Sequence, residues 1–311
     1  MNIKNPLFFL TSILLFSVAC AQNQKQEKTI KTGIEVLKIN DFDILKGKKV
    51  GLITNATGLS SALKPTIDIL YEAENVELVA LYGPEHGARG EIAAGDKVDD
   101  YVDPVTQVPV YSLYGKTRKP TKEMLENVDV LVYDIQDIGV RSYTYISTMG
   151  LAMEAAAEHD IDFVVLDRPN PLGGNKIEGN IAEEGYFSFV SQYPIPYVYG
   201  MTPGEVAILI NEEGWLGEGK KVNLTVVEME GWNRSMTFEE TGLQWVPTSP
   251  HIPHANSAYF YVSTGIMGEL GVFSEGVGYT LPFQVFAAEW IDERKLSENM
   301  NALNIPGVEF R

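Results

Sequence analysis

Short apolar runs alternate with helix-like segments along most of this 311-residue chain, and no other feature restricts its fold as strongly. Strand-like runs are expected at residues 49–54, 76–82, 128–133, 162–166 and 222–228. Helices are expected at residues 64–73, 122–126 and 144–159, and from Thr202 onward. Such alternation predicts βαβ units, in which helices cover a sheet of parallel strands. We therefore predict an α/β fold with a mostly parallel sheet, and the length allows a second lobe.

Polar turns follow the strand-like runs at the points where the strands are expected to end. They occupy residues 55–58, 83–87, 134–139 and 167–171. The carboxyl ends of parallel strands lie at one edge of the sheet, and α/β folds bind their ligands at that edge. We therefore expect these four turns to form one cleft.

The chain is strongly acidic, with 24 Lys and Arg against 42 Asp and Glu and a net charge of −18. This balance argues against a nucleic-acid partner, which requires clustered cations. It is compatible with an anionic small substrate, because a few local arginines suffice to hold one. Neither a G-x-G-x-x-G turn nor a G-x-x-x-x-G-K-[ST] loop is present, so we expect no nucleotide cofactor.

The N-terminus has the pattern of an export signal. Lys4 precedes a short apolar stretch at residues 7–18, which is too short for an ordinary membrane-spanning helix. Small residues then lead to Cys20, which predicts a lipoprotein signal at residues 1–20 and a lipid anchor on Cys20; the alternative is ordinary cleavage after Ala21. A polar tether is expected at residues 21–32. We therefore expect an exported protein, periplasmic or anchored to the outer membrane, whose only membrane contact is this lipid. Because Cys20 is the only cysteine, no disulfide framework forms within the chain.

Glu85 is the strongest candidate for a catalytic acid. Gly83, Pro84 and Gly87 allow the backbone to turn sharply and bring its carboxyl into a cleft. A desolvated Glu keeps its proton near neutral pH, and glycosidic cleavage needs an acid that protonates the leaving oxygen. The structural alternative is that Glu85 caps a helix or pairs with Arg89.

The second catalytic carboxyl has three candidates. Asp134 lies at a strand end, where it is also suited to anchoring loops. Asp137 lies within the following turn and is freer to act, and Glu178 follows a glycine pair on a loop that can reach the cleft. Position alone does not decide among them, because clustered acids are often structural.

Two arginines and two tyrosines near these turns suggest ligand contacts. Arg141 and Arg168 have the fork geometry that grips a ligand carboxylate; the alternative is a buried salt bridge to a neighbouring aspartate, Asp134 or Asp167. Tyr143 and the nearby tyrosine two residues later are suited to stacking on a sugar, and we expect one of the two to face the core.

The histidines raise the question of a metal site. His86, His251 and His254 lie in polar loop segments. The pair at 251 and 254 is not the helical H-E-x-x-H arrangement, and Pro253 between them disfavours a helix. We therefore expect no metal, and interpret these side chains as sugar contacts or loop packing.

Six segments together resemble a known family. They are GLITNATG, GPEHGARG, DIQDIGVRSYTY, VVLDRPNPLGG, MTPGE and FSEGVGYTLPF, spread over residues 45–290. Their combination is similar to the NamZ-type, formerly YbbC-like, exo-β-N-acetylmuramidases. The resemblance implies a Rossmann-like domain, assigned here to residues 33–190, and a smaller α+β lobe at residues 191–311. It also implies release of N-acetylmuramic acid from the non-reducing ends of peptidoglycan fragments, MurNAc-GlcNAc oligosaccharides, with Glu85 as the catalytic acid.

The lactyl carboxylate of N-acetylmuramic acid gives an arginine grip a purpose. The residues expected to bind substrate are Asn55, His86, Arg141, Tyr143, Arg168, Asn170 and Glu275. Two alternatives stay open: a surface sugar-binding lipoprotein without turnover, and a metal-dependent hydrolase.

The chain departs from the family pattern in places. Val198-Tyr199 stands before Gly-Met-Thr where many relatives carry Arg-His, which puts the sugar preference in question. His251 stands where relatives tend to carry Asn, and Val277 where an arginine is expected. The chain stops at Arg311, whereas relatives continue further, so we expect the second lobe to lack a C-terminal portion that closes the cleft.

Overall fold

The computed structural model describes residues 29–90 and 99–311. The predicted signal peptide, Cys20 and most of the predicted tether lie outside these residues. In the described part, no helix is both long enough and apolar enough to cross a membrane.

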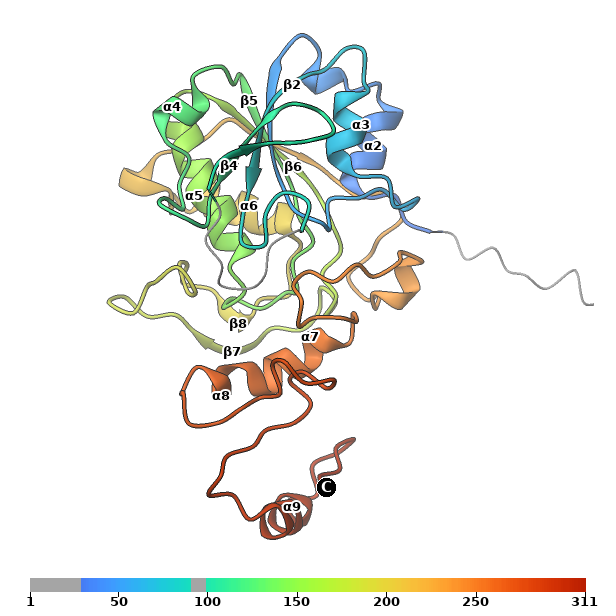
Figure 1. Ribbon diagram of the computed structural model, residues 1–311, viewed down its shortest axis with the longest axis vertical. Coiled ribbons are helices and arrows are strands. Elements are labelled where there is room, and N and C mark those ends of the chain that lie inside the picture. Colours follow the sequence, from blue (N-terminus) through green and yellow to red (C-terminus); the bar gives the residue numbers. More distant parts are fainter. Residues whose placement is uncertain (1–28, 91–98) are drawn as a thin grey trace, which may run out of the picture.

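A seven-stranded sheet forms the centre of the molecule (Figure 1). Its strands, in spatial order, are β3 (Tyr101–Val102), β4 (Pro109–Ser112), β2 (Glu77–Gly83), β1 (Lys49–Thr54), β5 (Val130–Asp134), β6 (Asp162–Leu166) and β9 (Leu224–Val227). Neighbouring strands are parallel except at the edge, where β3 runs antiparallel to β4. A separate antiparallel pair consists of β7 (Glu178–Ile181) and β8 (Pro196–Val198). The predicted fold class, α/β with a mostly parallel sheet, is confirmed.

Helices cover both faces of the large sheet. The helices on one face are α2 (Gly33–Ile39) and α3 (Thr66–Tyr71), and those on the other are α4 (Lys122–Leu125), α5 (Tyr145–Glu158) and α6 (Pro203–Glu212). Within β5, Val130 and Val132 pack with α2 and α3, whereas Leu131 and Tyr133 pack with α5 and α6. Because successive side chains of a strand point to opposite faces and both faces are covered, such strands are continuously apolar.

The start of α6 follows from its sequence. Thr202 is the N-cap, its hydroxyl accepts a hydrogen bond from the Glu205 amide, and Glu205 closes a capping box. Pro203 occupies the first helical position, where a missing amide hydrogen costs nothing. The Thr202 hydroxyl also donates to the Asp167 carboxylate at 2.8 Å, which ties the helix to the end of β6.

The N-terminal end of the described chain is fastened to the carboxyl edge of the sheet. The Ile30 amide donates to the Thr241 carbonyl, and Lys31 pairs with Glu230 as an isolated antiparallel bridge. The amide of Gly33 then donates to the Asp167 carbonyl, directly after β6, at 2.9 Å. The chain therefore enters the folded body at the same edge as the polar turns.

The C-terminal part contains little regular structure. Its short elements are η3 (Glu239–Thr241), α7 (Ser257–Phe260), η4 (Tyr261–Gly265), α8 (Ile266–Gly268) and α9 (Glu293–Ala302); earlier 3₁₀ turns are η1 (Asp43–Leu45) and η2 (Gly217–Gly219). Residues around Ile252, Ala258 and Phe283 form a third apolar cluster with Val140 and Val198. The strand β9 joins the large sheet although it falls within residues 191–311, the range assigned to the second lobe; that boundary stays a prediction.

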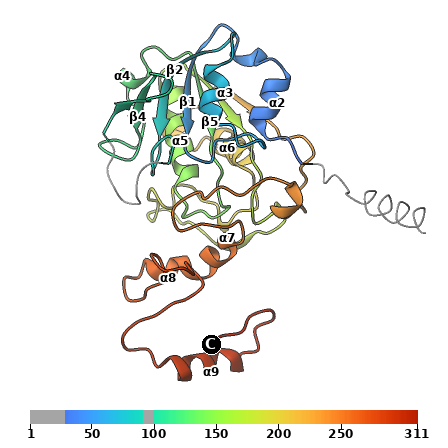
Figure 2. The same ribbon diagram turned by 45° about the vertical axis from the view of Figure 1, so that its right-hand side comes forward.

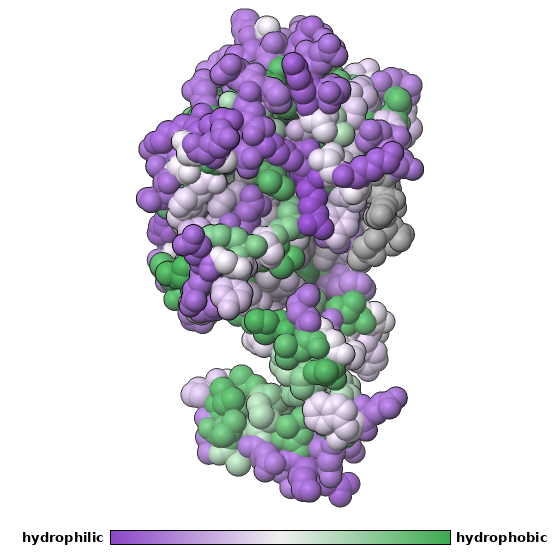
Figure 3. All heavy atoms as spheres, turned by 90° about the vertical axis from the view of Figure 1, so that its left-hand side faces the viewer, coloured by the Kyte–Doolittle hydropathy of each residue, from purple (hydrophilic) through white to green (hydrophobic). Residues whose placement is uncertain are grey.

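The segment from α8 to the C-terminus extends away from the sheet-containing body, as Figure 2 shows. Apolar side chains gather on this segment, whereas the opposite end of the molecule is mostly hydrophilic (Figure 3). Its exposed apolar residues include Ile266, Leu270, Trp290, Leu303 and Ile305.

Candidate active site

The carboxyl ends of the central strands bring the predicted turns together. Thr54, the last residue of β1, is in register with Asp134, the last residue of β5. Gly83 at the end of β2 is in register with Ser112 at the end of β4. Since β6 continues the parallel order beside β5, all four turns emerge at one edge, as the sequence predicts.

The turn that carries Glu85 is tight and partly strained. The Gly87 amide donates to the Pro84 carbonyl at 3.0 Å, and His86 and Gly87 have φ angles of 76° and 79°. A left-handed conformation is uncommon for a residue with a side chain and occurs preferentially at functional sites. His86 is buried, whereas Glu85 is half-buried, so the turn directs Glu85 toward solvent at the sheet edge.

Two tyrosines lie beside the Glu85 carboxyl. Tyr114, which follows β4, is hydrogen-bonded to Glu85, and its pKa is raised first by burial and then by the charge of Glu85. Burial, followed by the charges of Tyr143 and Glu85, also raises the pKa of Tyr145 well above its usual value. Arg89, the alternative partner for Glu85, donates to Asp103 at 2.6 Å.

A pocket of about 240 Å³ lies next to this turn. We call it the Asn55 pocket; its walls are Asn55, Ala56, His86, Gly90, Val246, Pro247, Thr248, Ser249 and Pro250. Its volume is just below the roughly 300–1,000 Å³ of typical ligand pockets, which suits one sugar residue. Asn55 and His86, both predicted to bind substrate, line this pocket.

A hydrogen-bond network fixes the walls of the Asn55 pocket. The Asn55 Oδ1 accepts from the amide of Thr57 at 2.9 Å and from its hydroxyl at 2.6 Å, and the Asn55 side chain also bonds to Tyr145. Tyr145 donates to the Thr248 carbonyl, and the hydroxyls of Tyr143 and Thr248 lie 2.8 Å apart. Tyr145 therefore contacts the pocket wall through Asn55 and Thr248, and it faces the core, as expected for one of the two tyrosines.

Asp137 is buried, with only 2% of its surface exposed. Its Oδ2 accepts hydrogen bonds from the Tyr199 hydroxyl and from the Gly139 amide, the latter at 2.7 Å. Among the described residues, its Oδ1 has no partner. Burial raises the pKa of Asp137 to about 6, against the lowering effect of these hydrogen bonds. Asp137 does not line the Asn55 pocket, so its role as the second catalytic carboxyl stays a prediction.

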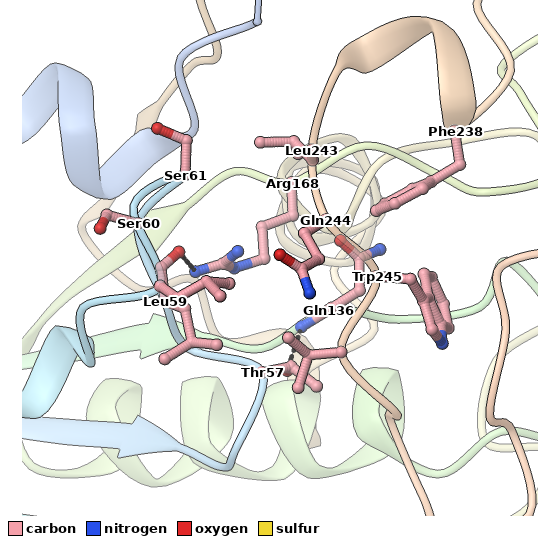
Figure 4. Close-up of a pocket in the computed structure, with 12 residues that line it drawn as sticks. Thr57, Leu59, Ser60, Ser61, Gln136, Arg168, Phe238, Leu243, Gln244 and Trp245 are labelled. Carbon is pink, nitrogen blue, oxygen red and sulfur yellow. Dashed lines mark hydrogen bonds between the residues drawn. The ribbon is translucent and has the colours of Figure 1, made fainter.

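Arg168, drawn in Figure 4 with its hydrogen bond to the Leu59 carbonyl, forms a buried ion pair with Asp134. Its Nε donates to one carboxylate oxygen at 2.5 Å and its Nη2 to the other at 2.9 Å, while Nη2 also donates to the Leu59 carbonyl. The hollow that Arg168 lines with Gln136 and Trp245 has a volume of about 30 Å³, which holds only about one or two water molecules. The alternative interpretation of Arg168, a salt bridge to a neighbouring aspartate, is therefore the arrangement observed.

Arg141 ties the β7–β8 region to the loop after β5. Its Nη1 donates to the carbonyls of Asn180, at 2.6 Å, and Ile195, and its guanidinium lies 5.8 Å from the centroid of the Tyr197 ring. Burial lowers the pKa of Arg141. The guanidinium thus bonds to backbone oxygens, an arrangement that suits a structural bridge.

Three further candidate residues lie outside the Asn55 pocket. Glu178 is exposed on β7. Asn170 holds its own loop, because its Nδ2 donates to the Met201 carbonyl at 2.9 Å and its Oδ1 accepts from the next-but-one amide. The Glu275 carboxylate packs against Gly268 in the C-terminal segment. Their predicted roles stay predictions.

Comparison with known proteins identifies the family. Residues 50–256 match the family described as exo-β-N-acetylmuramidase NamZ, N-terminal, and residues 259–311 match its C-terminal counterpart. The chain belongs to the NamZ family. It is 50% identical to the peptidoglycan β-N-acetylmuramidase NamZ of Bacillus subtilis (strain 168), over 99% of this chain and 75% of that protein.

Two crystal structures of DUF1343 family proteins from Bacteroides fragilis resemble this NamZ-family chain. One is 63% identical with a TM-score of 0.86, over 91% of this chain and 71% of the other. The second is 36% identical with a TM-score of 0.73, over 83% and 67% of the two chains. The fold of this chain is therefore that of the family.

Sequence reasoning missed several residues of this NamZ-family site. Tyr114 was missed because β4 was not expected, although the run Tyr111–Tyr114 is apolar enough to suggest a strand end. The segment 246–250 was missed because it has no periodicity. Tyr199 was noted only as a departure from the NamZ pattern, and the structure pairs it with Asp137.

The histidines do not form a recognisable metal centre. Among the residues that the structure describes, no group of three or more His, Cys, Asp or Glu side chains is arranged to hold a metal ion. His86 lines the Asn55 pocket, whereas His251 and His254 lie in the loop before α7.

Proposed function

We propose that this chain is an exo-β-N-acetylmuramidase that releases N-acetylmuramic acid from the non-reducing ends of peptidoglycan fragments. The observation that carries the proposal is the 50% identity to a peptidoglycan β-N-acetylmuramidase over 99% of the chain. The arrangement of Glu85 beside the Asn55 pocket supports it, because a half-buried carboxyl next to a hollow for one sugar is what an exo-acting glycosidase needs.

Glu85 is the proposed general acid. The terminal sugar occupies the Asn55 pocket, where Asn55 and His86 are available to its hydroxyls. Glu85 donates its proton to the glycosidic oxygen as the bond from that oxygen to the anomeric carbon breaks, and water supplies the new hydroxyl group. The hydrogen bond with Tyr114 holds one oxygen of the carboxyl in place, so that the other faces the departing sugar.

The second catalytic group has two protein candidates. Asp137 is buried with one unpartnered oxygen among the described residues, and Glu178 lies on an exposed outer strand. We favour Asp137, because it lies close enough to Tyr143 for its charge to add to burial in raising the pKa of that tyrosine, which contacts the Thr248 wall of the pocket. The 2-acetamido group of the substrate is the alternative nucleophile.

The cellular location is also a proposal. A lipid on Cys20 holds the enzyme at the periplasmic or outer-membrane surface, where peptidoglycan fragments arise. The short apolar stretch before the lone cysteine supports it.

Incubation with a chromogenic β-N-acetylmuraminide, with and without a chelator, tests the proposed activity. We expect turnover that the chelator does not change. Binding without turnover would favour a sugar-binding lipoprotein, and loss of turnover with the chelator would favour a metal-dependent hydrolase.

A further inference from the structure

The lactyl carboxylate of the proposed substrate requires a cation that the folded chain leaves available. Arg168 is neutralised by Asp134, and Arg141 is bonded to backbone carbonyls. Arg89 pairs with Asp103, and Arg234 pairs with Glu205. The cation must therefore come from elsewhere on the sheet edge.

Arg118 lies beside the candidate acid without being neutralised. It belongs to the loop after β4, and no ion pair in the described part of the chain involves it. Its guanidinium lies 6.0 Å from the ring centroid of Tyr114, the residue whose hydroxyl is hydrogen-bonded to Glu85. Besides burial, which has the largest effect on the pKa of Tyr114, the charge of Glu85 raises that pKa and the charge of Arg118 lowers it, so both charges are close to the same phenol.

Aromatic rings hold the Arg118 guanidinium in place. Its carbon lies 4.1 Å from the ring centroid of Phe189, a half-buried side chain in an otherwise exposed loop. Stacking covers the faces of a guanidinium and leaves its edge N–H groups free to form two parallel hydrogen bonds with a carboxylate. Arg118 is exposed, and its contacts with these two rings favour one orientation of the guanidinium.

The surrounding charges favour an anion at this point. The chain as a whole is acidic, yet Lys116, Arg118 and Lys119 stand within four residues. Lys119 is neutralised by Glu154 and a second glutamate, at 2.7 Å and 2.8 Å. Lys116 and Arg118 remain as local positive charges, and of the two only Arg118 is stacked on aromatic rings.

We propose that Arg118 is the specificity-determining residue of this site, and that its guanidinium binds the free lactyl carboxylate of the terminal N-acetylmuramic acid. The proposal rests on the proposed function. The carboxylate exists only where no peptide is attached to the lactyl group, because amide formation removes its charge. Arg118 therefore favours sugar ends whose lactyl carboxylate is free over those whose carboxylate is amidated.

The test compares two chromogenic muraminides, one with a free lactyl carboxylate and one whose lactyl group is a neutral methylamide. We expect the wild-type chain to prefer the carboxylate substrate. The Arg118→Gln variant should lose about 10- to 150-fold in kcat/KM on that substrate, mainly through KM, the span for a lost charge-assisted hydrogen bond. The kcat/KM of this variant on the methylamide should differ little from that of the wild-type chain. Its kcat/KM on the carboxylate substrate should no longer depend on the salt concentration.

Matched variants separate the role of Arg118 from general electrostatics. Lys116→Gln removes the same charge from the same loop without a stacked guanidinium, and should change kcat/KM less than about twofold. Phe189→Leu keeps the charge of Arg118 but removes its aromatic stacking partner. Its kcat/KM should fall by an amount between those of Lys116→Gln and Arg118→Gln, and only on the carboxylate substrate. Unchanged melting temperatures confirm that the variants are folded.

The outcomes are distinct. If the wild-type chain hydrolyses neither substrate, the proposed function fails. Carboxylate recognition by Arg118 is refuted if the wild-type chain is active but kcat/KM of Arg118→Gln falls equally on both substrates. It is also refuted if kcat/KM of Lys116→Gln falls as much as that of Arg118→Gln.

Discussion

Replacing Asp137 by Asn should remove a specific pH dependence from the stability of the protein. Burial raises the pKa of Asp137 from 3.8 to about 6. The folded state therefore binds this proton more tightly than the unfolded state. The resulting stabilisation is fully present below pH 3.8 and is lost as the pH rises through about 6.

The size of the effect follows from the pKa. One pKa unit corresponds to about 1.4 kcal/mol, so a rise from 3.8 to about 6 corresponds to about 3 kcal/mol of unfolding free energy. Asparagine has the same shape but no titrating proton. The free energy of unfolding of Asp137→Asn relative to the wild-type chain should thus increase by most of this amount, about 2.5 kcal/mol, between pH 4 and pH 7.

Urea unfolding at half-unit pH intervals from 3.5 to 7.5 measures this difference. Other titrating groups, including Asp167, whose pKa burial also raises to about 6, are present in both proteins and cancel. A Glu184→Gln variant on an exposed loop controls for the loss of a negative charge. Parallel wild-type and Asp137→Asn curves would show that the buried carboxyl does not titrate as reasoned.

Three further predictions concern single positions. The Glu85→Gln variant should lose about 10²–10⁴-fold in hydrolytic activity on a natural disaccharide, and less on an aryl glycoside, whose phenolate leaves unaided. A folded variant with full activity on the disaccharide contradicts the assignment. Cys20→Ser should release the protein from membranes in fractionated cells, and unchanged partitioning contradicts the lipid anchor. Gly139→Ala should lower the free energy of unfolding by about 2 kcal/mol or more, because Gly139 has a φ of +82° and an added Cβ would lie 2.2 Å from the Asn170 amide oxygen. Gly185 has a φ of +87° but open space around it, so Gly185→Ala should lower the free energy of unfolding by only about 1 kcal/mol in the same denaturant assay. Equal decreases for the two glycine variants would contradict the packing argument.

The large sheet was predictable wherever both faces of a strand are covered. The runs that became β1, β5 and β6 are continuously apolar because α2 and α3 pack on one side and α5 and α6 on the other. Strand β3 at one edge of the sheet and β4 beside it are short and lie among turn residues, so no periodicity marks them and only the apolar run at residues 111–114 hints at β4.

The candidate site was predictable where it depends on topology. Asn55, Glu85 and His86 each follow a strand, and parallel strands bring such positions to one edge. Pairings across that edge depend on tertiary packing. Sequence alone therefore left both roles of Arg168 open, and only the fold pairs it with Asp134.

The attachment of residues 30–33 at the carboxyl edge has a consequence for where the enzyme can work. If Cys20 carries a lipid, the eight residues between it and Thr29 span at most about 30 Å, even when fully extended. This segment leads into residues 30–33, which are attached beside Asp167 at the edge of the sheet that also holds the Asn55 pocket. A lipid on Cys20 would thus keep this edge of the sheet close to the membrane, so that the enzyme would act on glycan ends near that surface.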